Sequence, residues 1–285
     1  MAERLSYQEY SSGWGTGPTL KTRPVSVCGI VHHGALAHPG KTAVTFFGRD
    51  LTYREIDEMA ERFAAALGRL GVKEGDRVAA LLPNCPQHLI ALLAGNRLGA
   101  IHVAVGMLSQ GEELRGILSD SGARTVIVLD LFYDNVMAIV DKTAVREVIV
   151  AGMDDFFPPA MSAQHRANAR LDQIRAAIPY GGRVHGFTDL LKENAEVVAA
   201  PASFDSDDPL MILYTTGSAS RNKRVVTQRE LLHNAANLWQ TLVLRVSVWF
   251  SSRCFRQGGI SWAHSVDLMS VEMQLPSFAV MPVAC

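Results

Sequence analysis

Between residues 42 and 150 the chain alternates short apolar runs with longer amphipathic segments, and this alternation limits the possible fold more than any other sequence feature. The apolar runs have the length of buried strands, and they predict strands at residues 42–47, 77–82, 101–105, 125–129 and 146–150. Strands that alternate with helices form parallel sheets with right-handed crossovers. The sequence therefore predicts an α/β fold of doubly wound, mostly parallel sheets with flanking helices.

The helical segments between these runs carry recognisable start signals. Thr52 with Glu55, and Ser109 with Glu112, have the spacing of a capping box. In this motif a hydroxyl accepts from a free backbone N–H, while the glutamate accepts from the cap residue's own N–H. We therefore expect helices to begin after Thr52 and after Ser109.

The stretch 210–226, LMILYTTGSASRNKRVV, is typical of a strand followed by a phosphate-binding loop. Its first residues, 210–214, are apolar and predict a strand buried on both faces of a sheet. The loop combines small residues, hydroxyl donors and a cation at Lys223, which together suit the phosphates of a nucleoside triphosphate. The predicted nucleotide-binding residues are Thr215, Thr216, Gly217, Ser218, Ala219, Ser220 and Lys223.

A third capping box follows the loop, at Thr227 and Glu230, and predicts a helix that continues through residue 242. We expect this helix to point its N-terminus back at the loop. The positive end of its dipole would then stabilise a bound phosphate.

The loop resembles the signature of the adenylate-forming enzymes (AMP-dependent synthetases and ligases), which is roughly Tyr-Thr-Ser-Gly-Thr-Thr-Gly-x-Pro-Lys-Gly-Val. The positions that match in register are Tyr214, Thr215, Gly217, Lys223 and Val225, with conservative matches at Thr216 and Ser218. The positions that depart from it are Ala219, Ser220, Asn222 and Arg224. Side chains in place of glycine, at Ser220 and Arg224, predict weaker phosphate binding, since a left-handed non-glycine residue costs about 1–2 kcal/mol.

The resemblance extends through residues 51–100, which follow the family pattern almost position for position. A long segment ahead of the loop makes the chain most similar to the long-chain fatty acyl-CoA ligases. This resemblance implies a ligase that uses ATP and Mg to activate a fatty acid, or another small carboxylic acid, as its acyl-adenylate. The acyl group then forms a thioester with CoA.

The family pattern also predicts the domain organisation. Residues 1–24 form a poorly ordered lead-in, and residues 25–285 form a partial N-terminal adenylation domain. That domain divides into a core at 25–150, an insertion at 151–208 and a phosphate-loop subdomain at 209–285, and the small C-terminal domain is absent. Near the end, Phe255, Arg256 and Gly259 occupy the place of a family motif that borders the acyl and nucleotide pocket.

The family's later motifs are not found in the sequence, including the magnesium-binding glutamate and the adenylation lysine. No catalytic residue is therefore assigned, and we expect the chain as given to be impaired or inactive. Two alternatives remain open. One is a non-catalytic nucleotide-binding or interaction module, which acts as a homo-oligomer or pairs with an intact homologue, and the other is a degenerate remnant without function.

Charge and composition exclude several other classes. The formal net charge is −1 without a long basic run, which gives no basis for nucleic-acid binding, and no apolar stretch is long enough to span a bilayer. The cysteines are far apart, which argues against a zinc site or a disulfide framework and fits a cytoplasmic protein. His32, His33 and His38 have no carboxylate or cysteine at ligand spacing, so no metal site is predicted.

Overall fold

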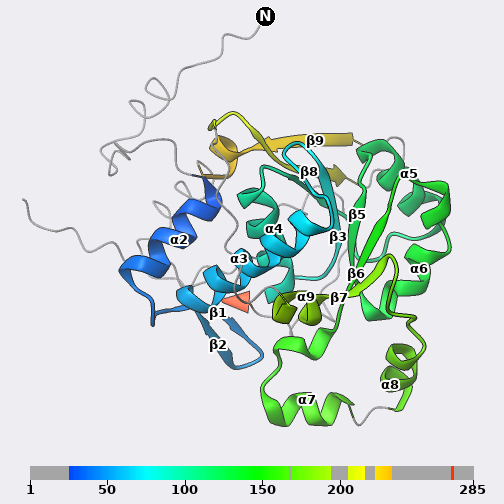
Figure 1. The fold of residues 1–285 in the computed structure, drawn as a ribbon, viewed down its shortest axis with the longest axis horizontal. Coiled ribbons are helices and arrows are strands. Elements are labelled where there is room, and N and C mark those ends of the chain that lie inside the picture. The colour runs from blue at the N-terminus through cyan, green and yellow to red at the C-terminus, as the bar shows by residue number, and fades with distance from the viewer. Residues whose placement is uncertain (1–25, 167–168, 194–204, 216–221, 233–270, 273–285) are drawn as a thin grey trace, which may run out of the picture.

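A seven-stranded sheet forms the centre of the computed structural model, which describes residues 26–166, 169–193, 205–215, 222–232 and 271–272 (Figure 1). Its strand order is β7-β6-β5-β3-β4-β8-β9. The strands are β3 (Arg77–Leu81), β4 (Ile101–Ala104), β5 (Thr125–Leu129), β6 (Glu147–Ala151), β7 (Val184–Gly186), β8 (Pro209–Thr215) and β9 (Asn222–Thr227). All neighbours pair in parallel except β8 and β9, which are antiparallel.

The connections make this sheet doubly wound, as predicted. β3 has β4 on one side and β5 on the other, so the winding direction reverses after β4. The helices are α2 (Val27–Ala37), α3 (Tyr53–Arg69), α4 (Pro86–Arg97), α5 (Gly111–Ser121), α6 (Tyr133–Met137), α7 (Pro159–Arg166), α8 (Ala169–Ala176) and α9 (Phe187–Glu193), with short 3₁₀ turns η1 (Asp130–Phe132), η2 (Val140–Lys142) and η3 (Met153–Phe156). In the described ranges, no helix is long and apolar enough to cross a membrane.

The central strands are buried on both faces because alternate side chains enter two separate apolar cores. In β5, Ile127 and Leu129 join a core with α2, α3, α4 and α9, whereas Val126 and Val128 join a second core with α5 and α6. Figure 1 shows α3 and α4 on one side of the sheet and α5 and α6 on the other. Since side chains alternate along a strand, the continuous apolar run of β5 reflects these two cores.

Strand β8 differs from this pattern, and the prediction that it is buried on both faces is wrong. Leu210 and Ile212 are buried, but Met211, Leu213 and Tyr214 are partly exposed. The core beneath α5 and α6 includes Ile212, whereas the core beneath α3 and α4 includes no described residue of β8. An apolar run alone did not reveal that one face of this strand is less covered.

The two predicted capping boxes before α3 and α5 have opposite outcomes. At α3 the box is present: the Glu55 N–H donates to Thr52 Oγ1 at 3.2 Å, and the Thr52 N–H donates to Glu55 Oε2 at 2.7 Å. At α5 the predicted box is wrong, because the cap residue is Gln110 and makes no side-chain cap bond. The Ser109 N–H instead donates to the Gly106 carbonyl in a preceding turn.

A smaller sheet lies beside the main one, in the order β10-β1-β2. Its strands are β1 (Thr42–Phe46), β2 (Arg49–Thr52) and β10 (Val271–Glu272). Phe47 and Gly48, with φ of 49° and 81°, form the tight turn between β1 and β2. The pairing of β10 with β1 returns a late segment of the chain to the first strand.

Residues from the predicted insertion are built into the main sheet. β7 pairs with β6 at the sheet edge, and α9 packs on α3, where the rings of Phe187 and Phe63 lie 4.4 Å apart. The predicted lead-in, residues 1–24, lies outside the described residues.

Candidate functional site

The candidate site is the pair of strands that flanks the predicted phosphate loop. β8 ends at Thr215 and β9 begins at Asn222, and these two residues are partners across the strand pair. Because β8 is parallel to β4, the intervening segment follows a carboxyl end of the sheet, where α/β folds bind their ligands. The segment 216–221 itself, and Phe255, Arg256 and Gly259, lie outside the described residues.

Lys223 and Tyr214 are cross-strand partners, and both contact Asp120 of α5. The Tyr214 hydroxyl donates to Asp120 Oδ2 at 2.6 Å. The Lys223 Nζ lies 3.1 Å from the same oxygen and donates to the Asp120 backbone carbonyl at 3.3 Å. The predicted phosphate-binding cation is therefore already in contact with an anion from a distant helix. We call these three residues the lysine cluster.

The electrostatics of the lysine cluster favour an ionised carboxylate beside a neutral phenol. The hydrogen bond from Tyr214, followed by that from Lys223, lowers the pKa of Asp120. Burial raises the pKa of Tyr214, and the hydrogen bond to Asp120 raises it further. At neutral pH the Asp120 carboxylate is thus ionised and the Tyr214 phenol keeps its proton.

Arg224 is not strained, although it stands where the family signature has a glycine. It lies inside β9 and pairs with Leu213 in the ladder. Among the described non-glycine residues, Phe47 is the one with positive φ. The left-handed backbone cost that we expected at Arg224 does not arise, so that prediction is wrong. Ser220, the other glycine replacement, lies outside the described residues.

The capping box after the loop is confirmed, but its predicted role is wrong. The Glu230 N–H donates to Thr227 Oγ1 at 3.2 Å, and the Thr227 N–H donates to Glu230 Oε2 at 3.3 Å. Thr227, however, is paired with Pro209, at the start of β8. Because β9 runs antiparallel to β8, it carries the helix start about 17 Å away from the loop. The helix dipole therefore does not act on a phosphate bound there.

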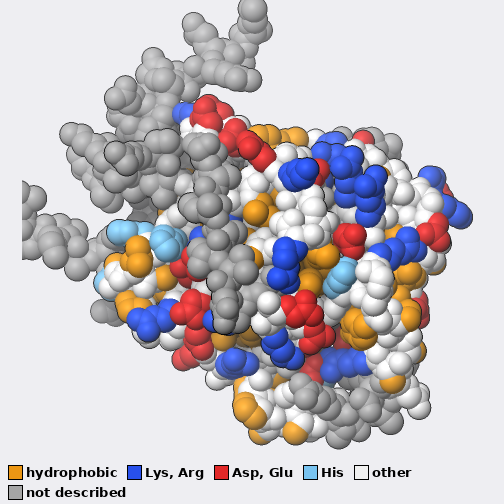
Figure 2. Space-filling model, in the orientation of Figure 1, with side chains coloured by type: hydrophobic (Ala, Val, Ile, Leu, Met, Phe, Trp, Pro, Cys, Tyr) orange, Lys and Arg blue, Asp and Glu red, His pale blue; other side chains and the backbone are white. Residues whose placement is uncertain are grey.

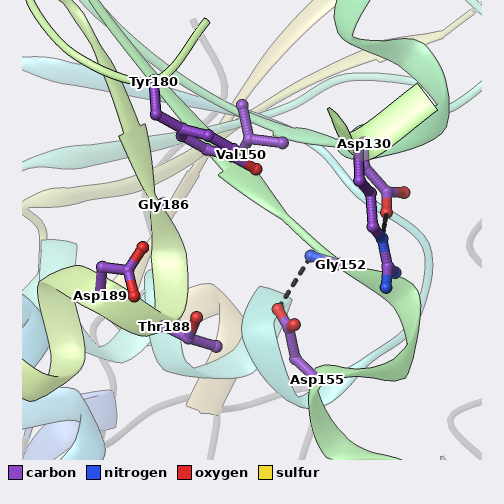
Figure 3. Close-up of a pocket in the computed structure, with 9 residues that line it drawn as sticks. Asp130, Val150, Gly152, Asp155, Tyr180, Gly186, Thr188 and Asp189 are labelled. Atoms are coloured by element: carbon purple, nitrogen blue, oxygen red, sulfur yellow. Dashed lines mark hydrogen bonds and ion pairs between the residues drawn. The ribbon is translucent and has the colours of Figure 1, made fainter. Parts of the chain in front are cut away.

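A pocket that sequence analysis did not predict lies at the carboxyl ends of β5, β6 and β7 (Figure 3). It has a volume of about 160 Å³. Figure 3 shows the carboxylates of Asp155 and Asp189 on opposite sides of it, below the Tyr180 ring. The lining residues are Asp130, Val150, Gly152, Asp155, Arg175, Tyr180, Gly186, Thr188 and Asp189.

One wall of this pocket is an ion-pair network around Arg175, which we call the arginine cluster. The Arg175 Nε donates to Asp130 at 2.6 Å, and a terminal nitrogen of the same guanidinium donates to Asp154. The two carboxylates are almost fully buried, with side-chain exposures of 5% and 1%. The cluster therefore ties α8 to the segments that follow β5 and β6.

Asp155 occupies the floor of the same pocket. Its carboxylate accepts from the Gly152 N–H at 2.8 Å, and burial raises its pKa to about 6. A Cβ atom at position 152 would lie 2.7 Å from an Asp155 oxygen, so a larger residue there would have to displace this carboxylate. The sequence contained a signal for these acids, since Asp130 and the Asp154-Asp155 pair each follow an apolar strand.

The structure also gives His32 carboxylate neighbours that chain spacing did not reveal. Asp57 and Glu61, one turn apart on α3, lie with His32 of α2 in a group that could hold a metal ion. Arg97 of α4 already occupies this group, because its guanidinium donates to Asp57 and lies 3.3 Å from Glu61. The arrangement therefore works as an ion-pair network that joins α2, α3 and α4.

Comparison with known proteins gives a consistent match. The family model described as AMP-binding enzyme matches residues 31–266. A long-chain-fatty-acid–CoA ligase of Bacillus subtilis is 28% identical over 207 residues, and one of Salmonella typhimurium is 30% identical over 216 residues. These alignments cover 72% and 73% of this chain but 37% and 38% of the relatives. The chain thus spans well under half the length of the curated relatives that it matches.

Solved structures match the fold at lower sequence identity. A long-chain-fatty-acid CoA ligase from Rhodopseudomonas palustris gives a TM-score of 0.61 at 22% identity, over 78% of this chain and 49% of that one. An anthranilate CoA ligase in complex with anthranoyl-AMP gives a TM-score of 0.62 at 21% identity, over 76% of this chain and 38% of that one. At these identities the matches show a shared fold.

Proposed function

The chain belongs to the AMP-binding enzyme family, and from this premise we propose that it supplies the nucleotide-phosphate wall of an ATP-dependent fatty acid–CoA ligase. The observation that carries the proposal is the position of Lys223. This lysine follows a loop with the hydroxyl-rich family pattern, and its partner strand ends where that loop begins. The curated relatives named above are CoA ligases of long-chain fatty acids.

In this proposal the loop backbone and hydroxyls contact the triphosphate, and Lys223 adds a charge. The binding residues are Thr215, Thr216, Gly217, Ser218, Ala219, Ser220 and Lys223. The geometry of Lys223 suits the role because its side chain is 39% exposed. An ammonium has three donors, and Asp120 accepts through two oxygens, which leaves one donor for an incoming phosphate.

ATP, accompanied by Mg²⁺, supplies the adenylyl group that activates a carboxylic acid, and CoA supplies the thiol. The residues of this chain bind and orient the phosphates rather than donate or accept protons. Phe255, Arg256 and Gly259 border the acyl and nucleotide pocket in this proposal. We assign residues 25–285 to part of an N-terminal adenylation domain, whose main sheet takes strands from all three predicted segments.

A cytoplasmic location fits the same proposal. Cys28 and Cys85 are buried free thiols, which is typical of proteins kept in a reducing compartment.

The proposal is tested by isothermal titration of ATP against the parent chain and the Lys223→Ala variant. We expect Lys223→Ala to weaken binding about tenfold, since it removes a charge-assisted contact to phosphate. Lys192→Ala is the matched control, because Lys192 is another exposed lysine that pairs with an aspartate, 3.3 Å away. Equal binding by the parent and Lys223→Ala would exclude Lys223 from the nucleotide site.

Turnover is measured separately, by ATP–pyrophosphate exchange in the presence of a fatty acid. Exchange would support ligase chemistry in this chain. ATP binding without exchange would instead favour a nucleotide-binding module.

A further inference from the structure

We propose that Asp120 competes with the nucleotide for the ammonium of Lys223 and thereby lowers the affinity of the phosphate site. This inference rests on the proposed function of Lys223. It adds a residue that lies outside the loop and outside the residues that the family signature assigns.

In the lysine cluster, one Asp120 carboxylate contacts both Tyr214 and Lys223. One oxygen of Asp120 accepts from the Tyr214 hydroxyl at 2.6 Å and lies 3.1 Å from the Lys223 Nζ. Tyr214 and Lys223 come from opposite strands at the loop end of the β8–β9 pair, and Asp120 comes from α5. A single carboxylate therefore connects both strands that flank the loop to a helix of the main core. Figure 1 shows the start of β9 beside α5.

Both charges of the lysine cluster are accessible to solvent. The side chains of Lys223 and Asp120 are 39% and 55% exposed, so solvent and solutes reach both charges. Figure 2 shows Lys and Arg side chains gathered on this side of the molecule, near α5 and β9. An exposed ion pair exchanges partners at small cost, because water screens it and its net stabilisation is weak. A phosphate can therefore displace or share the contact.

The negative charge of Asp120 is expected to weaken the binding of ATP. Asp120 lies 3.1 Å from the ammonium that would attract the phosphate, and its negative charge cancels most of that attraction. Asparagine at this position keeps an oxygen that accepts from the Tyr214 hydroxyl and removes the charge. Asp120→Asn is therefore expected to lower the Kd for ATP about threefold to fivefold and to make binding more sensitive to salt.

The test uses the full chain with its lysines labelled with ¹³C and ¹⁵N, which leaves all three N–H donors of each ammonium in place and gives each lysine an NMR signal. The Lys223 signal is the one missing from Lys223→Ala. ATP is titrated into the parent, Asp120→Asn and Asp141→Asn at two salt concentrations. Asp141→Asn is the matched control, since Asp141 forms another exposed ion pair, with Arg183 at 2.8 Å.

Three results support the inference together. The Lys223 signal shifts between the parent and Asp120→Asn before ATP is added, Asp120→Asn binds ATP about threefold to fivefold tighter, and Asp141→Asn binds like the parent. An unchanged Lys223 signal without ATP would overturn the inference, because the contact would not exist in solution.

The failure of the inference can be told apart from the failure of the proposed function. If Lys223 responds to ATP but Asp120→Asn binds no tighter than the parent, Asp120 does not compete and this inference is wrong. If ATP shifts the Lys223 signal in neither the parent nor Asp120→Asn, Lys223 does not bind the nucleotide and the proposed function is wrong.

Discussion

The arginine cluster and the lysine cluster are built from the same chemistry but differ in burial. Arg175 pairs with carboxylates that are 5% and 1% exposed, whereas Lys223 pairs with a carboxylate that is 55% exposed. Breaking a buried pair leaves an uncompensated charge and costs about 3–5 kcal/mol, but an exposed pair contributes about 0–1 kcal/mol. The comparison teaches that the arginine cluster holds the fold together, while the lysine cluster is free to exchange its anion for a ligand.

The largest effect is expected at the arginine cluster. Arg175→Met keeps the aliphatic stem but removes the guanidinium that Asp130 and Asp154 share, so the free energy of unfolding should fall by about 3 kcal/mol in urea titrations. Arg183→Met is the control, because it breaks the exposed pair with Asp141 and should change stability by less than about 1 kcal/mol. Equal effects of the two variants would remove the distinction between buried and exposed clusters.

A buried histidine pair should make the stability of the protein depend on pH. The Nε2 atoms of His88 and His102 lie 3.0 Å apart, and burial lowers the pKa of both rings. In the unfolded chain these histidines have a pKa of about 6.5. Below this pH the unfolded chain binds more protons than the folded chain, so stability falls as pH falls. Between pH 7 and 5 we therefore expect the free energy of unfolding to fall. His102→Gln should flatten this pH dependence, and an unchanged slope would show that the ring titrates freely.

Asp155, which lines the pocket beside the arginine cluster, should give a pH dependence of the opposite sign. Burial raises its folded pKa to about 6, so its contribution is present at low pH and is lost as pH rises through that value. Asp155→Asn should therefore stabilise the protein at pH 8 by on the order of 2 kcal/mol and have little effect at pH 4. The measurement is urea unfolding at both values. A variant that is less stable at pH 8 would show that this carboxylate is ionised and needed.

The smallest stability effect is expected at the lysine cluster. Asp120→Asn should change the free energy of unfolding by less than about 1 kcal/mol, since the pair is exposed and asparagine retains an acceptor for Tyr214. Thermal and urea unfolding measure this directly. A decrease of more than about 2 kcal/mol in the free energy of unfolding would show that the lysine cluster, like the arginine cluster, stabilises the fold.

Much of the fold followed from the sequence because the strongest signals are local. The predicted strand at 125–129 matches β5, and the capping box at Thr52 begins α3 as expected. These elements succeed because burial on both faces produces an uninterrupted apolar run and because a cap is satisfied within one turn. The box predicted at Ser109 failed since the preceding turn uses that residue's N–H.

The sites were harder to predict because their contacts are distant along the chain. Lys223 followed from the loop pattern, but Asp120 lies 103 residues away and no spacing rule connects the two. The orientation of the helix after Thr227 was missed for a related reason. Its start depends on β9 running antiparallel to β8, and the apolar pattern does not encode strand direction.

The comparison between the two clusters is tested most directly by a crystal structure of the chain soaked with ATP. The account predicts phosphate density within hydrogen-bond distance of the Lys223 Nζ, with the contact between Asp120 and that lysine lengthened or lost. It also predicts that Arg175 keeps its contacts with Asp130 and Asp154. Phosphate density at Arg175, with Lys223 still bound to Asp120, would contradict the account.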